Sequence, residues 1–208
     1  TLETTTKQVT NESTYGELPT PTKTGYTFVG WYDSDNNKIE STTTVNITEN
    51  KTLTAQWQIK QSKLFVNPNG GTWEGSKDIQ NFTQDYTTTK TISVPTQAPD
   101  GYTVVFDGNT GNCSTTQIIQ TTTFSKWLKS NGTALEGETY TFGTERETLT
   151  AQYIGNDILL PTPTKTGAKF KGWYTAATEG TKAGDAGKNY LPNENITLDR
   201  KSTRLNSS

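Results

Sequence analysis

The sequence contains no histidine, no methionine and a single cysteine, Cys113. Without histidine, the side chain that most often transfers protons near neutral pH and most often binds metals is missing. A lone cysteine cannot form an internal disulfide or a thiolate metal site, and no histidine-dependent catalytic dyad can exist. The sequence therefore predicts no cofactor and no metal site. The absence of methionine even at position 1 indicates an internal fragment or a processed product.

Long apolar runs and strong charge are missing as well. No stretch approaches the ~18–20 apolar residues that span a bilayer, and no signal peptide heads the chain, so we expect no membrane insertion of this fragment. A net charge of −2 without a Lys/Arg cluster argues against nucleic acid as a partner. Only 36 of 208 residues are Leu, Ile, Val or Phe. We therefore expect several small cores built on Trp, Tyr and Phe.

Threonine dominates what is present, with 44 of the 208 residues. Its β-branched, hydroxyl-bearing side chain suits the solvated face of a strand and is poor inside a helix. Glycine and asparagine supply turns. The composition predicts a mostly β fold made of short antiparallel strands, with few or no long helices.

Several phrases of the sequence recur. Identical or closely related segments are LPTPTKTG at 18–25 and 160–167, GYTFVGWY at 25–32 and GAKFKGWY at 167–174, LTAQW at 53–57 and LTAQY at 149–153, and TFVGW at 27–31 and TFSKW at 123–127. Self-similarity of this kind is the signature of a repeat architecture. The sequence therefore predicts a tandem array of small β-rich modules.

The repeats predict the module boundaries. We expect a first module at 1–60, an expanded middle module at 61–153 and a third module at 154–198. At 199–208 the chain reads DRKSTRLNSS where an Ala-Gln-aromatic phrase is expected. We interpret this tail as unstructured, and as a candidate sequencing or cloning scar, so that the third module lacks its last strand. Whether the 107–122 insertion forms strands or a loop stays open.

The central strand phrase predicts which aromatic side chains form the cores. Strict alternation along GYTFVGWY gives two faces, with Tyr26, Phe28 and Gly30 on one and Thr27, Val29 and Trp31 on the other. The tryptophans on repeated strand positions are interpreted as core residues rather than as a sugar platform: Trp31, Trp57 and Trp173. Trp73 follows the Asn69-Gly70-Gly71 turn outside the repeated phrases, so we expect it to be exposed and name it as the ligand-binding candidate.

The acidic residues give only weak support for a calcium site or for a glycosidase active site. The segment Asp33–Asn37 resembles a calcium loop, but the glycine and the terminal glutamate of that pattern are missing, so a solvated turn is the better interpretation. A glycosidase needs two paired carboxylates, and the candidate acids sit in turns and polar edges: Glu17, Asp33, Glu40, Asp107, Glu136, Glu138, Glu145 and Glu147. We therefore expect no catalytic residues and no enzyme.

The phrases around Leu18–Thr22, Gly25–Tyr32 and Leu53–Trp57 resemble the Listeria–Bacteroides repeat, the B-repeat type of internalin-like surface proteins. The resemblance implies a small β-grasp-like α+β or mostly β module on secreted or cell-wall proteins of Gram-positive and some other bacteria. It also implies a stalk, spacer or adhesive role and transfers no catalytic residue. The chain departs from the pattern in the expanded middle module, in the tail and at Ala168–Lys169.

Two functions follow as hypotheses. The first is a non-catalytic extracellular array on a bacterial cell surface or cell wall, acting as stalk, spacer and adhesion element and present as a monomer. The alternative is a carbohydrate- or host-receptor-binding module that uses exposed aromatic residues of the middle module, Trp73 first. The partners expected under either hypothesis are cell-wall or host-surface glycans, or host proteins.

Overall fold

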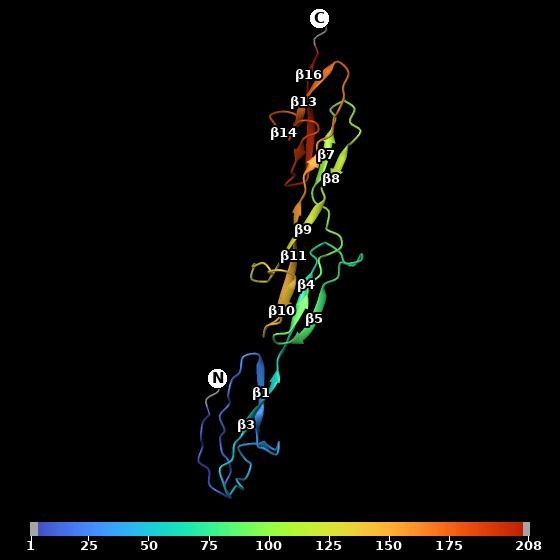
Figure 1. Ribbon diagram of the computed structural model, residues 1–208. Coiled ribbons are helices and arrows are strands. Elements are labelled where there is room, and N and C mark those ends of the chain that lie inside the picture. Colours follow the sequence, from blue (N-terminus) through green and yellow to red (C-terminus); the bar gives the residue numbers. More distant parts are fainter. Residues whose placement is uncertain (1–3, 206–208) are drawn as a thin grey trace. The chain divides into compact units, whose positions relative to one another are not determined.

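The regular elements of the protein are all strands (Figure 1). A computed structural model describes residues 4–205. No helix occurs among these residues, and hence none of the kind that would cross a bilayer. The prediction of a mostly β repeat fold is confirmed. The α+β variant that the resemblance implied is not what residues 4–205 adopt.

Five sheets contain the sixteen strands of the described chain. Two sheets have two strands each, and the other three have three, four and five. Each sheet is given in spatial order: the three-stranded sheet is β2 (Lys38–Ile39), β1 (Tyr26–Tyr32) and β3 (Thr54–Ile59), and the four-stranded sheet is β5 (Gln80–Asp85), β4 (Gln61–Asn67), β11 (Glu147–Gly155) and β9 (Thr122–Leu128). The five-stranded sheet is β14 (Lys182–Gly184), β13 (Ala168–Tyr174), β16 (Ile196–Arg204), β7 (Thr103–Asp107) and β8 (Gln117–Ile119). The two-stranded sheets are β10 (Thr139–Thr141) with β6 (Thr89–Thr91), and β12 (Ile158–Leu159) with β15 (Asn189–Tyr190).

Strand β4 shows why a sequence so poor in large apolar residues forms sheets. Ser62, Leu64 and Val66 are buried while Gln61 and Lys63 are exposed, which is the period-2 pattern of a strand with one solvated face. A single row of apolar side chains per strand is enough, because the other row stays in water. Polar and threonine-rich segments therefore form strands here rather than disordered chain.

The chain folds into two compact units. Unit 1 takes in the chain up to Phe65 together with 81–92 and 136–148. One buried cluster of this unit consists of Tyr15, Ile39 and Val45. Because this unit combines segments that are distant in the sequence, contiguous modules at 1–60, 61–153 and 154–198 stay a prediction.

Unit 2 takes in 66–80, 93–135 and the chain from Leu149 onward. One buried cluster of this unit consists of Val104, Phe106, Ile158, Leu160, Trp173 and Leu198. Part of the 107–122 insertion forms β8, which pairs with β7. Strand β7 in turn runs parallel to β16, so this part of the expanded middle segment completes the sheet that contains β13.

The same strand pair occurs three times with one register. In copy 1 (β1/β3), Trp31 faces Ala55 and Phe28 faces Trp57. The equivalent partners are Trp127 with Ala151 and Phe124 with Tyr153 in copy 2 (β9/β11), and Trp173 with Arg200 and Phe170 with Ser202 in copy 3 (β13/β16). The repeated phrases therefore encode one structural unit, and TFSKW is a genuine equivalent of TFVGW.

A β-bulge in each copy overturns the predicted alternation of side chains. In copy 1 the register shifts between Phe28 and Gly30, so one extra residue, Val29, lies opposite no partner. The shift brings Phe28 and Trp31 to the same face, where their ring centroids are 5.7 Å apart in an edge-on contact. The expectation that these two rings lie on opposite faces was wrong, because strict alternation assumes an unbroken ladder.

Glycine follows the bulge only where another strand covers it. Gly172 has φ +140°, and a Cβ there would lie 2.6 Å from Cε of Lys182 on the neighbouring β14. Gly30 stands in the same relation to Lys38 of β2. Copy 2 makes the bulge with Lys126 in this position, since β9 is an edge strand with no strand beyond it. The glycine therefore serves the close approach of the covering strand.

The recurring Pro-Thr-Pro-Thr phrase is bound to the tryptophan that follows it. Nε1 of Trp31 donates a hydrogen bond to the Pro19 carbonyl at 2.7 Å. Nε1 of Trp173 donates one to the Pro161 carbonyl at 2.9 Å. The sequence separation is 12 residues in both cases. The phrase recurs because its first proline carbonyl accepts the indole proton of its own copy, and we call this contact the Pro–Trp bond.

The tryptophans differ in burial, which corrects part of the core prediction. Trp173 is fully buried, as expected. Trp31 and Trp57, in the three-stranded sheet of copy 1, are only half-buried. Trp127 of copy 2 is buried, but its Nε1 has no hydrogen-bond partner in the described chain. The Pro–Trp bond is thus present in copies 1 and 3 only.

The expectation of an unstructured tail after residue 198 was wrong for residues 199–204. These residues form the second half of β16 and pair with β13 from Asp199 to Arg204. Backbone hydrogen bonds, which do not depend on side-chain identity, extend the strand through the divergent sequence. The third copy therefore has its last strand. Residues 206–208 of the predicted tail lie outside the described residues.

The divergent sequence nevertheless changes the core of copy 3. Arg200 occupies the position of Ala55 and Ala151 and is only 2% exposed. Its Nη1 donates to Oγ of Ser202 at 2.8 Å, while its Nε and Nη2 have no partner in the described chain. Ser202 in turn stands where copies 1 and 2 have an aromatic ring. Burying a charged group with two unsatisfied donors destabilises this copy.

Replacing Trp173 by Phe should destabilise the chain more than replacing Trp127 by Phe. Both side chains are buried, and both substitutions replace an indole by a phenyl ring. Only Trp173→Phe breaks a hydrogen bond, which leaves the Pro161 carbonyl without its partner. We expect the two losses in free energy of unfolding to differ by ~1–3 kcal/mol in urea denaturation followed by circular dichroism. Equal losses would show that the Pro–Trp bond contributes nothing.

The Arg200→Ala variant should be more stable than the parent chain. It restores the residue that the register places there in copies 1 and 2, and it removes two buried, unsatisfied donors, for an expected gain of ~1–3 kcal/mol. The matched control is Ala151→Arg, which buries the same charge in copy 2 and should lower stability. A lower urea midpoint for Arg200→Ala would contradict this account of copy 3.

Candidate functional site

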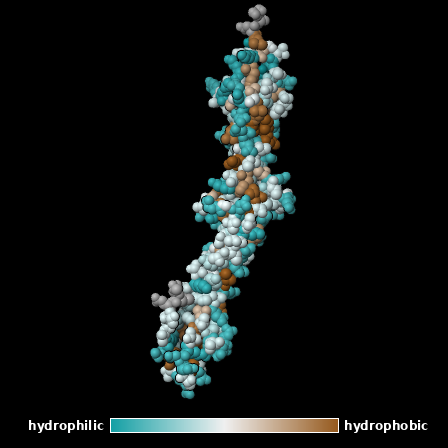
Figure 2. Space-filling model, viewed as in Figure 1, coloured by the Kyte–Doolittle hydropathy of each residue, from teal (hydrophilic) through white to brown (hydrophobic). Residues whose placement is uncertain are grey.

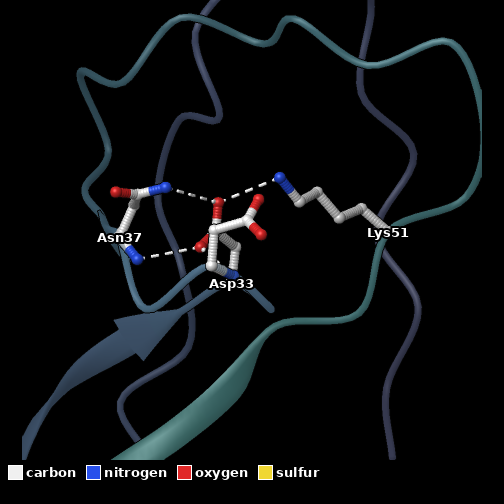
Figure 3. Close-up of polar contacts among 4 residues, drawn as sticks. Asp33, Asn37 and Lys51 are labelled. Carbon is white, nitrogen blue, oxygen red and sulfur yellow. Dashed lines mark hydrogen bonds and ion pairs between the residues drawn. The ribbon is translucent and has the colours of Figure 1, made fainter.

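The segment that resembled a calcium loop is a turn organised by Asp33 (Figure 3). Oδ1 of Asp33 accepts hydrogen bonds from the backbone N–H groups of Asp35 at 3.0 Å and Asn37 at 2.8 Å. Its Oδ2 accepts from Nζ of Lys51 at 2.9 Å and from Nδ2 of Asn37 at 3.3 Å. Within residues 4–205 no group of three or more metal-type side chains gathers. This carboxylate therefore stabilises a turn.

The hydrogen bonds to Asp33 lower the pKa of its carboxyl group. The hydrogen bond from Lys51, followed by the one from the Asn37 backbone, lowers the pKa of Asp33 from 3.8 to about 2. The same hydrogen bond raises the pKa of Lys51. Both shifts favour the charged forms, so the pair stays ionised near neutral pH and is unsuited to donate or accept a proton there.

Trp73, the candidate from the sequence, is half-buried rather than exposed. The Asn69-Gly70 turn that precedes it forms, with positive φ at both residues. The ring of Trp73 stacks on Trp127 with 6.3 Å between centroids and 14° between planes, and its Nε1 is buried without a partner in the described chain. One face of the ring is thereby used inside the protein. A ligand-binding role for Trp73 stays a prediction.

Unit 2 contains an open groove of about 990 Å³. It lies where the ends of β7, β8, β9, β11 and β15 come together, and Figure 2 shows hydrophobic side chains gathered over the stretch that Figure 1 labels β7, β8 and β9. Its lining residues are Asp100, Gly101, Tyr102, Gln120, Thr122, Tyr153, Ile154, Gly155, Tyr190, Leu191, Pro192, Asn193 and Asn195. We call this the tyrosine groove.

A buried glutamine joins the segments that line the groove. Gln120 is 1% exposed, and its Oε1 accepts a hydrogen bond from the Tyr102 backbone at 3.2 Å. Its Nε2 donates to the carbonyl of Asn156 at 2.9 Å and approaches that of Pro192 at 3.5 Å. A Cβ on Gly155 would meet this amide at 2.3 Å. One satisfied polar side chain therefore holds three chain segments at fixed separation.

Above this floor the groove presents both apolar and polar side chains. Tyr102 is 43% exposed, Ile154 58% and Leu191 59%. The side chains of Asp100 and Asn193 are exposed and have no hydrogen-bond partner within residues 4–205. Apolar surface beside a few unpaired polar groups makes this groove the candidate site of unit 2.

The other two tyrosines of the groove form its walls. Tyr153 donates its hydroxyl to the Pro68 carbonyl at 2.7 Å, and burial raises its pKa. Burial, with a smaller contribution from Glu194, also raises the pKa of Tyr190. Both therefore remain neutral phenols at physiological pH. The hydroxyl of Tyr153 is therefore used inside the protein, whereas the hydroxyl of Tyr102 makes no bond in the described chain.

The chemistry of the groove suits binding. Its lining contains the carboxylate of Asp100, and Glu194 lies close enough to Tyr190 to raise the pKa of that phenol. The remaining polar groups are amides and hydroxyls, which form hydrogen bonds without changing charge near neutral pH.

Repeated bulged strand pairs, each with an aromatic core, define the protein as a β-rich repeat protein. The sequence matches the model of the Listeria-Bacteroides repeat domain at residues 2–56 and 136–199, which is more than half of the chain. The chain therefore belongs to the Listeria–Bacteroides repeat family, and the resemblance noted in the sequence is confirmed. This family is typical of extracellular or surface proteins and is generally non-catalytic. No solved structure matches the chain.

The groove residues were not found from the sequence. Ile154 and Leu191 lie outside the repeated phrases, and an apolar residue in a strand-rich chain is normally interpreted as a core residue. The sequence did not indicate a role for Gln120 either, because a single glutamine in a polar segment belongs to no recognisable motif. The only signal was that apolar residues interrupt polar segments at Ile154 and Leu191.

Unit 1 should lose stability in acid through Asp33. Because the pKa of Asp33 is lowered in the folded state, its contribution is complete above pH about 4 and is lost as the pH falls through about 2. Asp33→Asn should be less stable than the parent at pH 7 and should show a flatter fall between pH 4 and 2 in urea titrations. Asp35→Asn is the matched control, since its carboxylate receives none of these bonds. Equal pH profiles for Asp33→Asn and the parent would contradict the assignment.

Proposed function

We propose that this chain is a non-catalytic spacer and adhesion element of a bacterial cell-surface protein. The observation that carries the proposal is the threefold recurrence of one bulged strand pair with the same register. An enzyme is usually organised around one active site. In this chain the feature that recurs is a packed structural core. Repetition of a core extends a chain while each copy stays folded.

Membership of the repeat family supports the surface location. Under this proposal the chain works outside the cell, as a monomer, between segments that anchor it and segments that it presents. The threonine-rich exposed strand faces suit this setting, because they keep the modules hydrated without strong charge. The adhesive part of the role would use the exposed groups of unit 2, where the tyrosine groove lies.

The spacer role predicts that the folded chain protects what it carries. We would display the chain on a Gram-positive cell between a wall anchor and an epitope tag, and measure tag retention by antibody binding after protease treatment. We expect the native chain to retain the tag. The matched control, Leu198→Asp, places a charge at a fully buried site and should lose the tag. Equal loss from both displays would overturn the spacer proposal.

A further inference from the structure

We propose that the tyrosine groove binds a neutral polysaccharide chain. The inference rests on the proposed adhesive role and gives it a site and a ligand class. Its contact residues are Tyr102, Ile154 and Leu191 for the apolar faces of the sugar rings, and Asp100 and Asn193 for the hydroxyl groups.

The apolar contacts are unusual for this chain. Roughly half of the surface of Tyr102, and more than half of that of Ile154 and Leu191, is open to solvent at one place. Exposed apolar groups that cluster mark interaction sites, whereas single ones need no explanation. A pyranose ring presents flat C–H surfaces of matching size, and an exposed tyrosine offers an apolar face with a wet polar end.

The polar contacts match a polyhydroxylated ligand. A sugar hydroxyl both donates and accepts, so it can bond to the free carboxylate of Asp100, to the free amide of Asn193 and to the phenol of Tyr102. None of these three side chains makes a hydrogen bond elsewhere in residues 4–205. Binding therefore breaks no interaction within the protein.

The charge of the groove selects a neutral polymer over an anionic one. Asp100 is the only charged residue in the lining, and no lysine or arginine accompanies it. A sulfated or phosphorylated chain would meet a negative charge without a cation to balance it. Neutral glycans meet no such repulsion.

A peptide strand fits the groove less well. Peptides commonly bind by adding a strand to free backbone groups of a sheet edge. The backbone groups in the floor are already used: Gly101 N–H donates to the Gln120 carbonyl at 2.8 Å, and Gln120 N–H donates to the Tyr102 carbonyl at 2.8 Å. These backbone groups are therefore not free to pair with an added strand.

Size and rigidity also favour an extended ligand. The groove volume of about 990 Å³ lies at the top of the ~300–1,000 Å³ range of ligand sites, so it holds more than one sugar ring. Gln120 fixes the segments that carry Tyr102 and Asn156 before any ligand arrives. A preformed site loses little conformational freedom on binding.

The test is isothermal titration of the full chain with a panel of hexasaccharides. The neutral probes are α- and β-linked glucans, mannan, galactan and chitin fragments; the other arms are a heparin hexasaccharide and a Pro-Thr repeat peptide. We expect binding of at least one neutral probe, weakened about tenfold or more by Tyr102→Ala and by Leu191→Ser. Tyr102→Phe should keep most of the affinity, because it retains the ring.

Matched controls locate the binding. Ile79→Ala removes an apolar side chain that is 51% exposed but lies outside the groove, and it should leave affinity unchanged. Trp73→Ala should also leave it unchanged. The proposal is overturned if no neutral probe binds at millimolar concentration, if heparin or the peptide binds instead, or if Trp73→Ala rather than Leu191→Ser abolishes binding. Leu191 is exposed, so its substitution tests the site without unfolding the chain.

Failure here and failure of the spacer role give different results. A chain that binds no sugar but still protects a displayed tag from protease would keep the spacer role and lose only the glycan site. A chain that fails the display test but binds sugar would keep the glycan site and lose the spacer role.

Discussion

The bulge that breaks each copy's central strand is the constraint on which the rest of the structure depends. One extra residue between Phe28 and Gly30 turns two rings that strict pleating would separate onto one face. The indole of Trp31 then reaches the Pro19 carbonyl, and the proline-rich segment is held against the strand. Each copy thereby builds a core from a few aromatic rings, which a chain this poor in aliphatic residues requires.

The three copies show what happens when parts of this arrangement change. Copy 2 keeps the bulge but loses the Pro–Trp bond, and its tryptophan packs against a second tryptophan, Trp73, instead. Copy 3 keeps the Pro–Trp bond but has Arg200 and Ser202 in place of a small residue and an aromatic ring. Its Trp173 packs on Phe106 from β7 with 5.0 Å between ring centroids, so a strand from the middle segment supplies the missing ring.

The tyrosine groove arises from the same departure from a simple array. Strand β7 belongs by sequence to the expanded middle segment, yet it pairs with β16 of copy 3. The ends of β8, β11 and β15 meet there, and Gln120 joins them with hydrogen bonds. Copy 1 lacks such an expansion and has only its own small sheet. Family membership accounts for the repeated core, and eight of the thirteen groove residues also lie in the segment 136–199 that matches the family model.

Local pattern was enough to determine the class of this protein. Threonine content and turn residues indicated a β fold, and the recurring phrases identified the repeat family, because both depend on residues close together in sequence. Three features needed the tertiary structure. The bulge depends on the partner strand, and the pairing of residues 199–204 depends on backbone bonds that side chains do not report. The groove depends on Tyr102 and Leu191, which lie about 90 residues apart in the sequence and come together only in the folded chain. Local sequence propensity does not encode a contact over that separation.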